Sequence, residues 1–144
     1  MDEKERNTGY NENEIPITIF KTDKSELLIR KVNFISTCEH HLASITESQC
    51  WVGIVPNKKL LGMNKIDKIV KYFGARLQIQ ERMTGQIADW IMENIQPLGT
   101  IVVIKANHMC ASLQGDEGSF TTSAIRGKFM REPELRAEFY SLIK

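Results

Sequence analysis

The first part of the chain has the apolar pattern of half-buried strands. Residues 15–20 carry isoleucine at every second position, which predicts a strand with one buried face. Two further extended segments are predicted at residues 27–35 and 45–55. We expect the polar residues 21–25 to turn between the first two strands. Residues 56–59, Pro-Asn-Lys-Lys, predict a turn after the third strand.

The apolar period then changes to that of a helix. Asn64 and Asp67, three positions apart, form a variant of the capping box, and the helix is predicted to end near Gly74. Its apolar face consists of Ile66, Ile69, Val70 and Phe73. A longer helix is predicted over residues 79–95 by apolar side chains at helical spacing. Residues 96–99, Gln-Pro-Leu-Gly, should stop it.

Strands return after the second helix. Residues 100–104 are β-branched and apolar, which predicts a strand, and we expect residues 109–113 to continue it. A turn at residues 115–119 and a strand at residues 120–125 would complete a hairpin. The last apolar pattern, at residues 132–143, predicts a helix.

This order of strands, two helices, strands and helix predicts an α+β fold. Strands from both ends of the chain can meet in one antiparallel sheet, with the two central helices packed across one face. Residues 1–14 lack apolar periodicity, and we expect them to form a mobile N-terminal tail. Residues 15–144 are predicted to be a single domain.

The composition narrows the class of protein. The 144 residues are 42% hydrophobic and carry a net charge of +1, which argues against general disorder and against a basic footprint for nucleic acid. No apolar stretch approaches the roughly 20 residues that span a bilayer. The polar N-terminal segment is unlike a signal peptide. With three cysteines, an odd number, the chain is expected to be cytoplasmic.

Three side chains form a candidate zinc site. Cys38 and His41 lie three positions apart between two predicted strands, and Cys110 lies in the predicted hairpin. If these strands pair, the three ligands would leave a fourth zinc position for water, which zinc converts to a nucleophile near neutral pH. The alternative is that the cysteines are ordinary buried residues. Cys50 is predicted to be a strand residue and could only complete a structural zinc site.

The distribution of the histidines favours the metal hypothesis. His40 and His108, together with His41, are all the histidines of the chain, and they occupy two short segments. Scattered use in a core would not give this distribution. Because imidazole titrates near neutrality, His40 and His108 are candidates for proton transfer around an activated water. Taken singly, each could be a hydrogen-bonded surface or core residue.

The segments around these residues resemble the GTP cyclohydrolase I family. The likeness runs in order from about Asn33 to the C-terminus and includes both ligand segments. The motifs that carry it are Ser36-Thr37-Cys38-Glu39-His40-His41-Leu42, Val55-Pro56-Asn57 followed by Gly62-Met63-Asn64-Lys65-Ile66, Gln78-Ile79-Gln80-Glu81-Arg82-Met83-Thr84 with Gln86-Ile87-Ala88, Pro97-Leu98-Gly99, and His108-Met109-Cys110.

The resemblance implies a fold, an assembly and a reaction. The fold is the T-fold, an antiparallel sheet with two helices layered on it, here followed by a C-terminal helix. The assembly is a homo-oligomeric ring, a decamer of two pentamers, with active sites between subunits. The reaction is hydrolysis of the guanine imidazole ring of GTP at C8, with loss of formate, rearrangement of the ribose and closure to 7,8-dihydroneopterin triphosphate. Such a product feeds folate, pterin-cofactor or deazaguanine synthesis.

The resemblance also implies roles for the metal and acid–base residues. Cys38, His41 and Cys110 match the ligands of a Zn²⁺ cofactor. His108 and His40 match the histidines that transfer protons during ring opening and the later steps.

The substrate-binding roles follow in the same way. Glu81 matches the carboxylate that anchors guanine, and an acceptor-only group can take both N1–H and the 2-amino group. Gln80 matches a position near the base, although a solvated helix face is the alternative for both residues. Lys65 matches a triphosphate-binding lysine in a first helical turn. Lys68 stands where many members have Arg, and Asn64 stands where Ser is common.

The phosphate site departs most from the family pattern. Gln114 replaces an expected phosphate-binding Arg, and the acids Asp116 and Glu117 follow it, where they would repel a triphosphate. Arg126 or Lys128 could replace part of the lost charge. We expect this chain to be a short form that lacks the family's helical N-terminal region. Two alternatives therefore stay open: a related T-fold zinc hydrolase of a guanine nucleotide or nucleoside with fewer phosphates, and an inactive guanine- or pterin-binding ring subunit.

Overall fold

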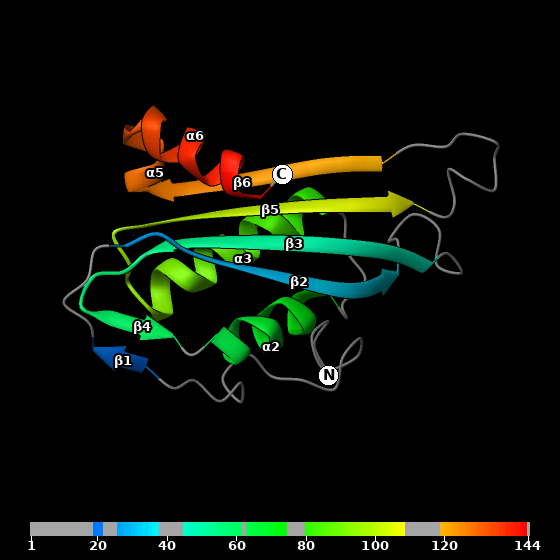
Figure 1. The fold of residues 1–144 in the computed structure, drawn as a ribbon. Helices are drawn as coiled ribbons and strands as arrows, with labels where there is room; N and C mark the ends of the chain where they lie inside the picture. The colour runs from blue at the N-terminus through cyan, green and yellow to red at the C-terminus, as the bar shows by residue number, and fades with distance from the viewer. Residues whose placement is uncertain are drawn as a thin grey trace.

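A computed structural model of the chain describes residues 19–21, 26–37, 45–61, 63–74, 80–108 and 119–143. Its main sheet has four strands in the spatial order β2-β3-β5-β6, and every neighbouring pair is antiparallel (Figure 1). The strands are β2 (Leu28–Thr37), β3 (Ile45–Val55), β5 (Gly99–His108) and β6 (Ser119–Gly127).

The strands predicted for this sheet are confirmed, with changes at their ends. β3 has the predicted bounds, and β5 extends the predicted strand to His108. Ser119, which we expected in the turn of the hairpin, is instead the first residue of β6. The expectations for residues 1–14, 109–113 and 115–118 lie outside the described residues.

A smaller sheet pairs β1 (Ile19–Lys21) with β4 (Lys59–Leu61), and its register sets Ile19 opposite Leu61. The turn expected at residues 21–25 falls mostly outside the described residues, but the strands on its two sides belong to different sheets. These two strands follow each other in the sequence but do not pair with each other. Periodicity indicates which face of a strand is buried, but it does not identify the strand beside it.

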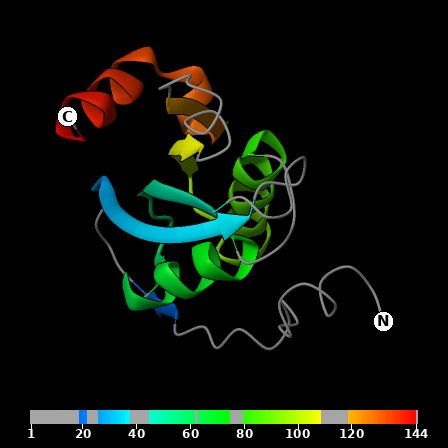
Figure 2. The ribbon, with the colours of Figure 1, turned by 90° about the vertical axis from the view of Figure 1, so that its right-hand side faces the viewer.

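Two helices, α2 (Met63–Gly74) and α3 (Gln80–Asn94), cover one face of the main sheet (Figures 1 and 2). Their predicted apolar faces are confirmed, because these side chains are buried against the inward-facing side chains of the strands. This main core comprises, among others, Val32, Cys50, Val52, Ile66, Ile69, Val70, Phe73, Met83, Ile87, Trp90, Ile91, Val102 and Ile104.

The predicted start of α2 was wrong. The helix begins at Met63, so Asn64 lies inside the first turn and is not the N-cap residue. The carboxylate of Asp67 contacts the guanidinium of Arg30 on β2. The local sequence suggested a capping box because Asp67 lies three positions after Asn64. It could not show that Asp67 instead pairs with an arginine on a distant strand.

The second face of the sheet is covered by the C-terminal helices α5 (Lys128–Arg131) and α6 (Pro133–Leu142), as Figure 2 shows. The predicted final helix is thus confirmed, whereas α5 was not predicted. Phe129 and Phe139 are fully buried in this second core, which also includes Val55, Ile101 and Val103. Proline at the first position of α6 fits the helix start, where the missing N–H has no partner to lose.

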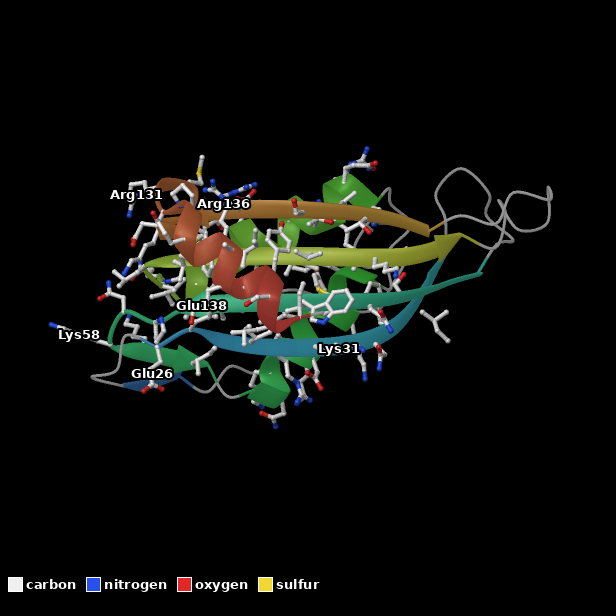
Figure 3. All side chains as sticks on the ribbon, turned by 45° about the horizontal axis from the view of Figure 1, so that its top comes forward. Glu26, Lys31, Lys58, Arg131, Arg136 and Glu138 are labelled. Atoms are coloured by element: carbon white, nitrogen blue, oxygen red, sulfur yellow. The ribbon has the colours of Figure 1, made fainter. Side chains whose placement is uncertain are left out.

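The link between α5 and α6 is fixed by Arg136 (Figure 3). Its Nη1 donates to the carbonyl oxygens of Phe129 at 2.6 Å and Met130 at 3.1 Å, and these carbonyls lie at the end of α5. The predicted α+β class is confirmed by this arrangement of one four-stranded sheet between two helical layers. Within the described residues, no helix is both long and apolar enough to cross a membrane.

Candidate functional site

One end of the main sheet is formed by the ends of β2 and β5 and the starts of β3 and β6. The register sets Thr37 opposite Ile45, Thr46 opposite His108, and Asn107 opposite Ser119. The segments 38–44 and 109–118 therefore both connect to the sheet at this end. The ends of β2 and β5 are separated by β3 alone, which corresponds to roughly 10 Å at the usual strand spacing.

The predicted metal and acid–base residues belong to these two connecting segments. Cys38, His40, His41 and Cys110 lie outside the described residues, and of His108 only the backbone is described, as the last residue of β5. In sequence, Cys38 directly follows β2 and Cys110 follows His108 by two positions. Among the described residues, no three His, Cys, Asp or Glu side chains are grouped to hold a metal ion.

The two helices of the main core run in opposite directions. α2 runs parallel to β2. Asp67, in the first half of the helix, contacts Arg30 near the start of the strand, and Gly74, at the end of the helix, lies beside the ring of Phe34 further along the strand. Contacts with β6 likewise give the direction of α3: Gln80 bonds Thr122 in the first half of the strand, and Asp89 bonds Arg126 near its end.

Since β2 and β6 are antiparallel, the first turns of α2 and α3 lie at opposite ends of the helical layer. The structure therefore brings Gln80 and Glu81 toward the end of the sheet that carries the two connecting segments. It leaves Asn64, Lys65 and Lys68 nearer the other end.

Gln80 is held by the sheet. Its Nε2 donates to the carbonyl oxygen of Ile104 at 2.9 Å and to the hydroxyl of Thr122 at 3.1 Å. Thr84 and Thr122, which the sequence reasoning did not select, join the same network. A signal existed, because Thr84 is a polar residue within the otherwise apolar face of α3.

Glu81 follows Gln80 in the first turn of α3 and is exposed to solvent. A carboxylate at this position is favoured by the positive end of the helix dipole. It is therefore available to a ligand that carries hydrogen-bond donors.

The α2 lysines form a small positive cluster. Lys65 is half-buried and Lys68 is exposed one turn later, next to an exposed Asn64 at the helix start. Partial burial lowers the pKa of Lys65, and the charge of Lys68 lowers it further. The two positive charges repel each other, and a bound anion would offset this repulsion.

The two cations suggested as substitutes for the missing arginine have other partners. The Nε of Arg126 donates to Asp89 at 2.8 Å, and Nζ of Lys128 lies 3.7 Å from Glu132. Both residues lie at the Gly99 end of the sheet, because the register sets Thr100 opposite Arg126. They are thus remote from the end that carries segment 109–118.

Cys50 is a residue of strand β3, as predicted. It is fully buried in the main core, opposite Val32 and Ile104 on the neighbouring strands, and burial raises the pKa of its thiol. A buried, protonated thiol is a poor metal ligand. This buried position does not support the alternative that Cys50 completes a structural zinc site.

Comparisons with known proteins agree with the sequence motifs. The GTP cyclohydrolase I family matches residues 3–144. The chain is 42% identical over 143 residues to GTP cyclohydrolase 1 of Campylobacter jejuni subsp. jejuni (strain 81-176), which covers 94% of this chain and 75% of that protein. It is 39% identical over 130 residues to GTP cyclohydrolase 1 of Dictyostelium discoideum, covering 88% of this chain and 56% of that protein.

A solved structure supports the fold. The apo form of the archaeosine synthase QueF-Like superposes with a TM-score of 0.62 at 16% identity, covering 74% of this chain and 97% of the other. At this identity the likeness concerns the fold alone, and the predicted T-fold is confirmed. The chain belongs to the GTP cyclohydrolase I family, which confirms the family predicted from its motifs and the prediction of a GTP cyclohydrolase I-like hydrolase.

Proposed function

We propose that this chain is a zinc-dependent enzyme that opens the guanine imidazole ring of GTP at C8, releases formate and yields 7,8-dihydroneopterin triphosphate. The observation that carries the proposal is the family match over residues 3–144. The match spans both cysteine segments, which connect to the same end of the sheet.

Zinc is proposed from the chemistry of the donor set. Cys38, His41 and Cys110 would hold the ion, because two thiolates and one imidazole suit zinc and leave a position open. When bound, zinc would supply an acidified water as the nucleophile. The strand register supports the grouping, since β2 and β5 end within two strand spacings of each other. His40 and His108, in the same segments, would hold and transfer protons at the reacting nitrogens.

Guanine recognition is assigned to Glu81. Its exposed carboxylate, at the start of α3, would accept from N1–H and the 2-amino group. Adenine presents no such pair of donors, so it would leave the carboxylate unpaired and be rejected. We expect Glu81→Ala to lose guanine selectivity and to keep its metal. Unchanged affinity for guanine nucleotides would refute this role.

The triphosphate is assigned to Lys65 and Lys68, with Asn64 beside them. A second candidate function is favoured by the positions of Arg126 and Lys128, which do not supply the charge missing at Gln114. It is hydrolysis of a guanine nucleotide or nucleoside with fewer phosphates. Comparing turnover of GTP, GDP, GMP and guanosine separates the two: the second candidate predicts little loss when the γ-phosphate is removed.

A homo-oligomeric ring with shared sites is proposed for the assembly. The first turns of α2 and α3 lie at opposite ends of the helical layer, so Lys65 and Glu81 of one chain are poorly arranged to meet on one ligand. Residues from different copies could do so. Mixing inactive Lys65→Met and Glu81→Ala chains should then restore part of the activity, and native mass spectrometry would give the number of subunits. No restoration in mixed rings would argue for a site within one chain.

The deciding experiment is a GTP incubation with and without a chelator. Formate and dihydroneopterin fluorescence should appear with the untreated protein, vanish with chelator and return on adding zinc. A protein that binds GTP and assembles but releases no formate would instead be the inactive ring subunit. The cytoplasmic location predicted from the sequence stays a prediction.

A further inference from the structure

Four polar groups form a closed ring of hydrogen bonds where α3 meets the sheet. The Nε2 of Gln80 lies 3.1 Å from Oγ1 of Thr122, which lies 2.7 Å from Oγ1 of Thr84. The hydroxyl of Thr84 is in turn 2.7 Å from the backbone carbonyl oxygen of Gln80. The ring therefore starts and ends on the same residue.

The direction of each bond follows from the chemistry of the groups. The carbonyl oxygens of Ile104 and Gln80 can only accept, so Nε2 donates to Ile104 and the single hydroxyl hydrogen of Thr84 goes to Gln80. Thr122 must then donate to Thr84, and its oxygen accepts the second hydrogen of Nε2. Each hydroxyl gives one bond and receives one. The amide nitrogen of Gln80 has both hydrogens engaged within the chain.

This ring is partly buried in the main core, because Thr84 is buried while Gln80 and Thr122 are half-buried. Thr84 is 1% exposed, and its neighbours Met83, Ile87 and Ala88 on α3 are buried apolar residues. The buried hydroxyl of Thr84 is costly unless it is paired, so removing the Thr122 hydroxyl takes away the donor to its oxygen. Gln80 is therefore attached to β5 and β6 directly through its side chain, and to β6 indirectly through its carbonyl and Thr84.

Glu81 is the next residue along the first turn of α3. Its Cα is bonded to the peptide unit whose carbonyl the ring holds. We propose that Thr122 and Thr84 are positioning residues that fix the direction of the Glu81 carboxylate for guanine. The proposal rests on the guanine-binding role given above to Glu81. Neither threonine is proposed to touch the ligand.

The test measures the affinities of the full, zinc-loaded protein for GTP and for ITP by rapid mixing, before either nucleotide is turned over. ITP lacks the 2-amino group, so the ratio of the two affinities reports how well a carboxylate accepts both donors of guanine. We expect Thr122→Val, which keeps the shape and removes the hydroxyl, to reduce this ratio about three- to tenfold, the range for one lost hydrogen bond. Thr122→Ser should restore the ratio.

The chain offers a matched control on the same strand. Thr121 precedes Thr122, is exposed, and lies on the opposite face of β6, so Thr121→Val should leave the GTP-to-ITP ratio unchanged. Thr84→Val breaks the ring from the helix side and provides a second test if Thr122→Val folds poorly. A purely structural role would lower the melting temperature of the variants and leave the ratio as it is in the wild type, and that result would overturn the proposal.

Failure of this inference differs from failure of the proposed function. If the wild type prefers GTP to ITP and both valine variants keep that preference, the positioning role is wrong while guanine binding stands. If the wild type binds neither nucleotide, or binds both equally, the guanine-binding role of Glu81 is wrong and the inference falls with it.

Discussion

Arg30 holds Asp67 through two parallel hydrogen bonds. Its Nε donates to Oδ1 and its Nη2 to Oδ2, both at 2.8 Å, so the pair joins the start of β2 to the first turns of α2. The guanidinium matches a carboxylate in this two-pronged geometry. The hydrogen bonds from Arg30 lower the pKa of Asp67 below its ordinary value of 3.8. The helix that carries Lys65 and Lys68 is thereby fixed to the sheet.

This pair predicts a pH-dependent contribution to stability. Because the pKa of Asp67 is lowered in the folded chain, its contribution is fully present above the ordinary pKa of 3.8 and is lost as the pH falls through the lower, folded value. We expect Asp67→Asn to lower the free energy of unfolding at neutral pH. The difference from the wild type should shrink in acid, as measured by urea unfolding over a pH series.

Asp89 is the matched control for this prediction. It also bonds an arginine across the helix–sheet boundary, but through a single contact and with 58% of its side chain exposed. Water screens such a pair, so Asp89→Asn should cost less stability than Asp67→Asn. Equal losses would contradict the special weight given to the two-pronged contact.

Two glycines predict opposite effects of the same substitution. A Cβ on Gly53 would lie 2.7 Å from Cδ2 of Phe139 and 2.8 Å from Cγ2 of Ile101, so Gly53→Ala should destabilise the chain by about 1–3 kcal/mol through overpacking. A Cβ on Gly85 in α3 would lie 3.7 Å from Nη2 of Arg126. Gly85→Ala should stabilise the chain by about 0.5–1 kcal/mol, the usual gain in a helix interior. Thermal unfolding measures both, and a stable Gly53→Ala protein would refute the packing.

The zinc proposal predicts different outcomes for two cysteines. Cys110→Ala should lose zinc and formate release while the domain stays folded. Cys50→Ala removes a thiol that is buried in the main core, so the protein should keep its zinc at some cost in stability. Metal analysis of the two purified variants makes the comparison. Full zinc occupancy in Cys110→Ala would remove this residue from the ligand set.

The proton-transfer role of His108 predicts a purely chemical defect. His108→Ala should retain zinc and GTP binding but release formate about 10²- to 10⁴-fold more slowly, the usual contribution of a general acid or base. Single-turnover formate release, compared with metal content and GTP affinity in the same preparation, separates these effects. A near-normal rate would assign His108 another role.

The sequence alone determined the elements whose patterns are long and regular. β3 and the bodies of α2 and α3 follow from alternation and from helical spacing, because a buried face imposes its period on the local sequence. The motifs around Cys38, Glu81 and Cys110 determined the family. The metal ligands themselves stay predictions, since Cys38, His41 and Cys110 lie outside the described residues.

The tertiary structure decided which elements and side chains become partners. It pairs β1 with β4, and it places Asp67 against Arg30, where the sequence predicted a helix cap. The amide nitrogen of Gln80 donates to Ile104 and Thr122. It also set the first turns of α2 and α3 at opposite ends of one layer. The physical reason is that periodicity records only that a face is buried. The groups that meet across that face are separated by tens of residues and are chosen by packing of the whole chain.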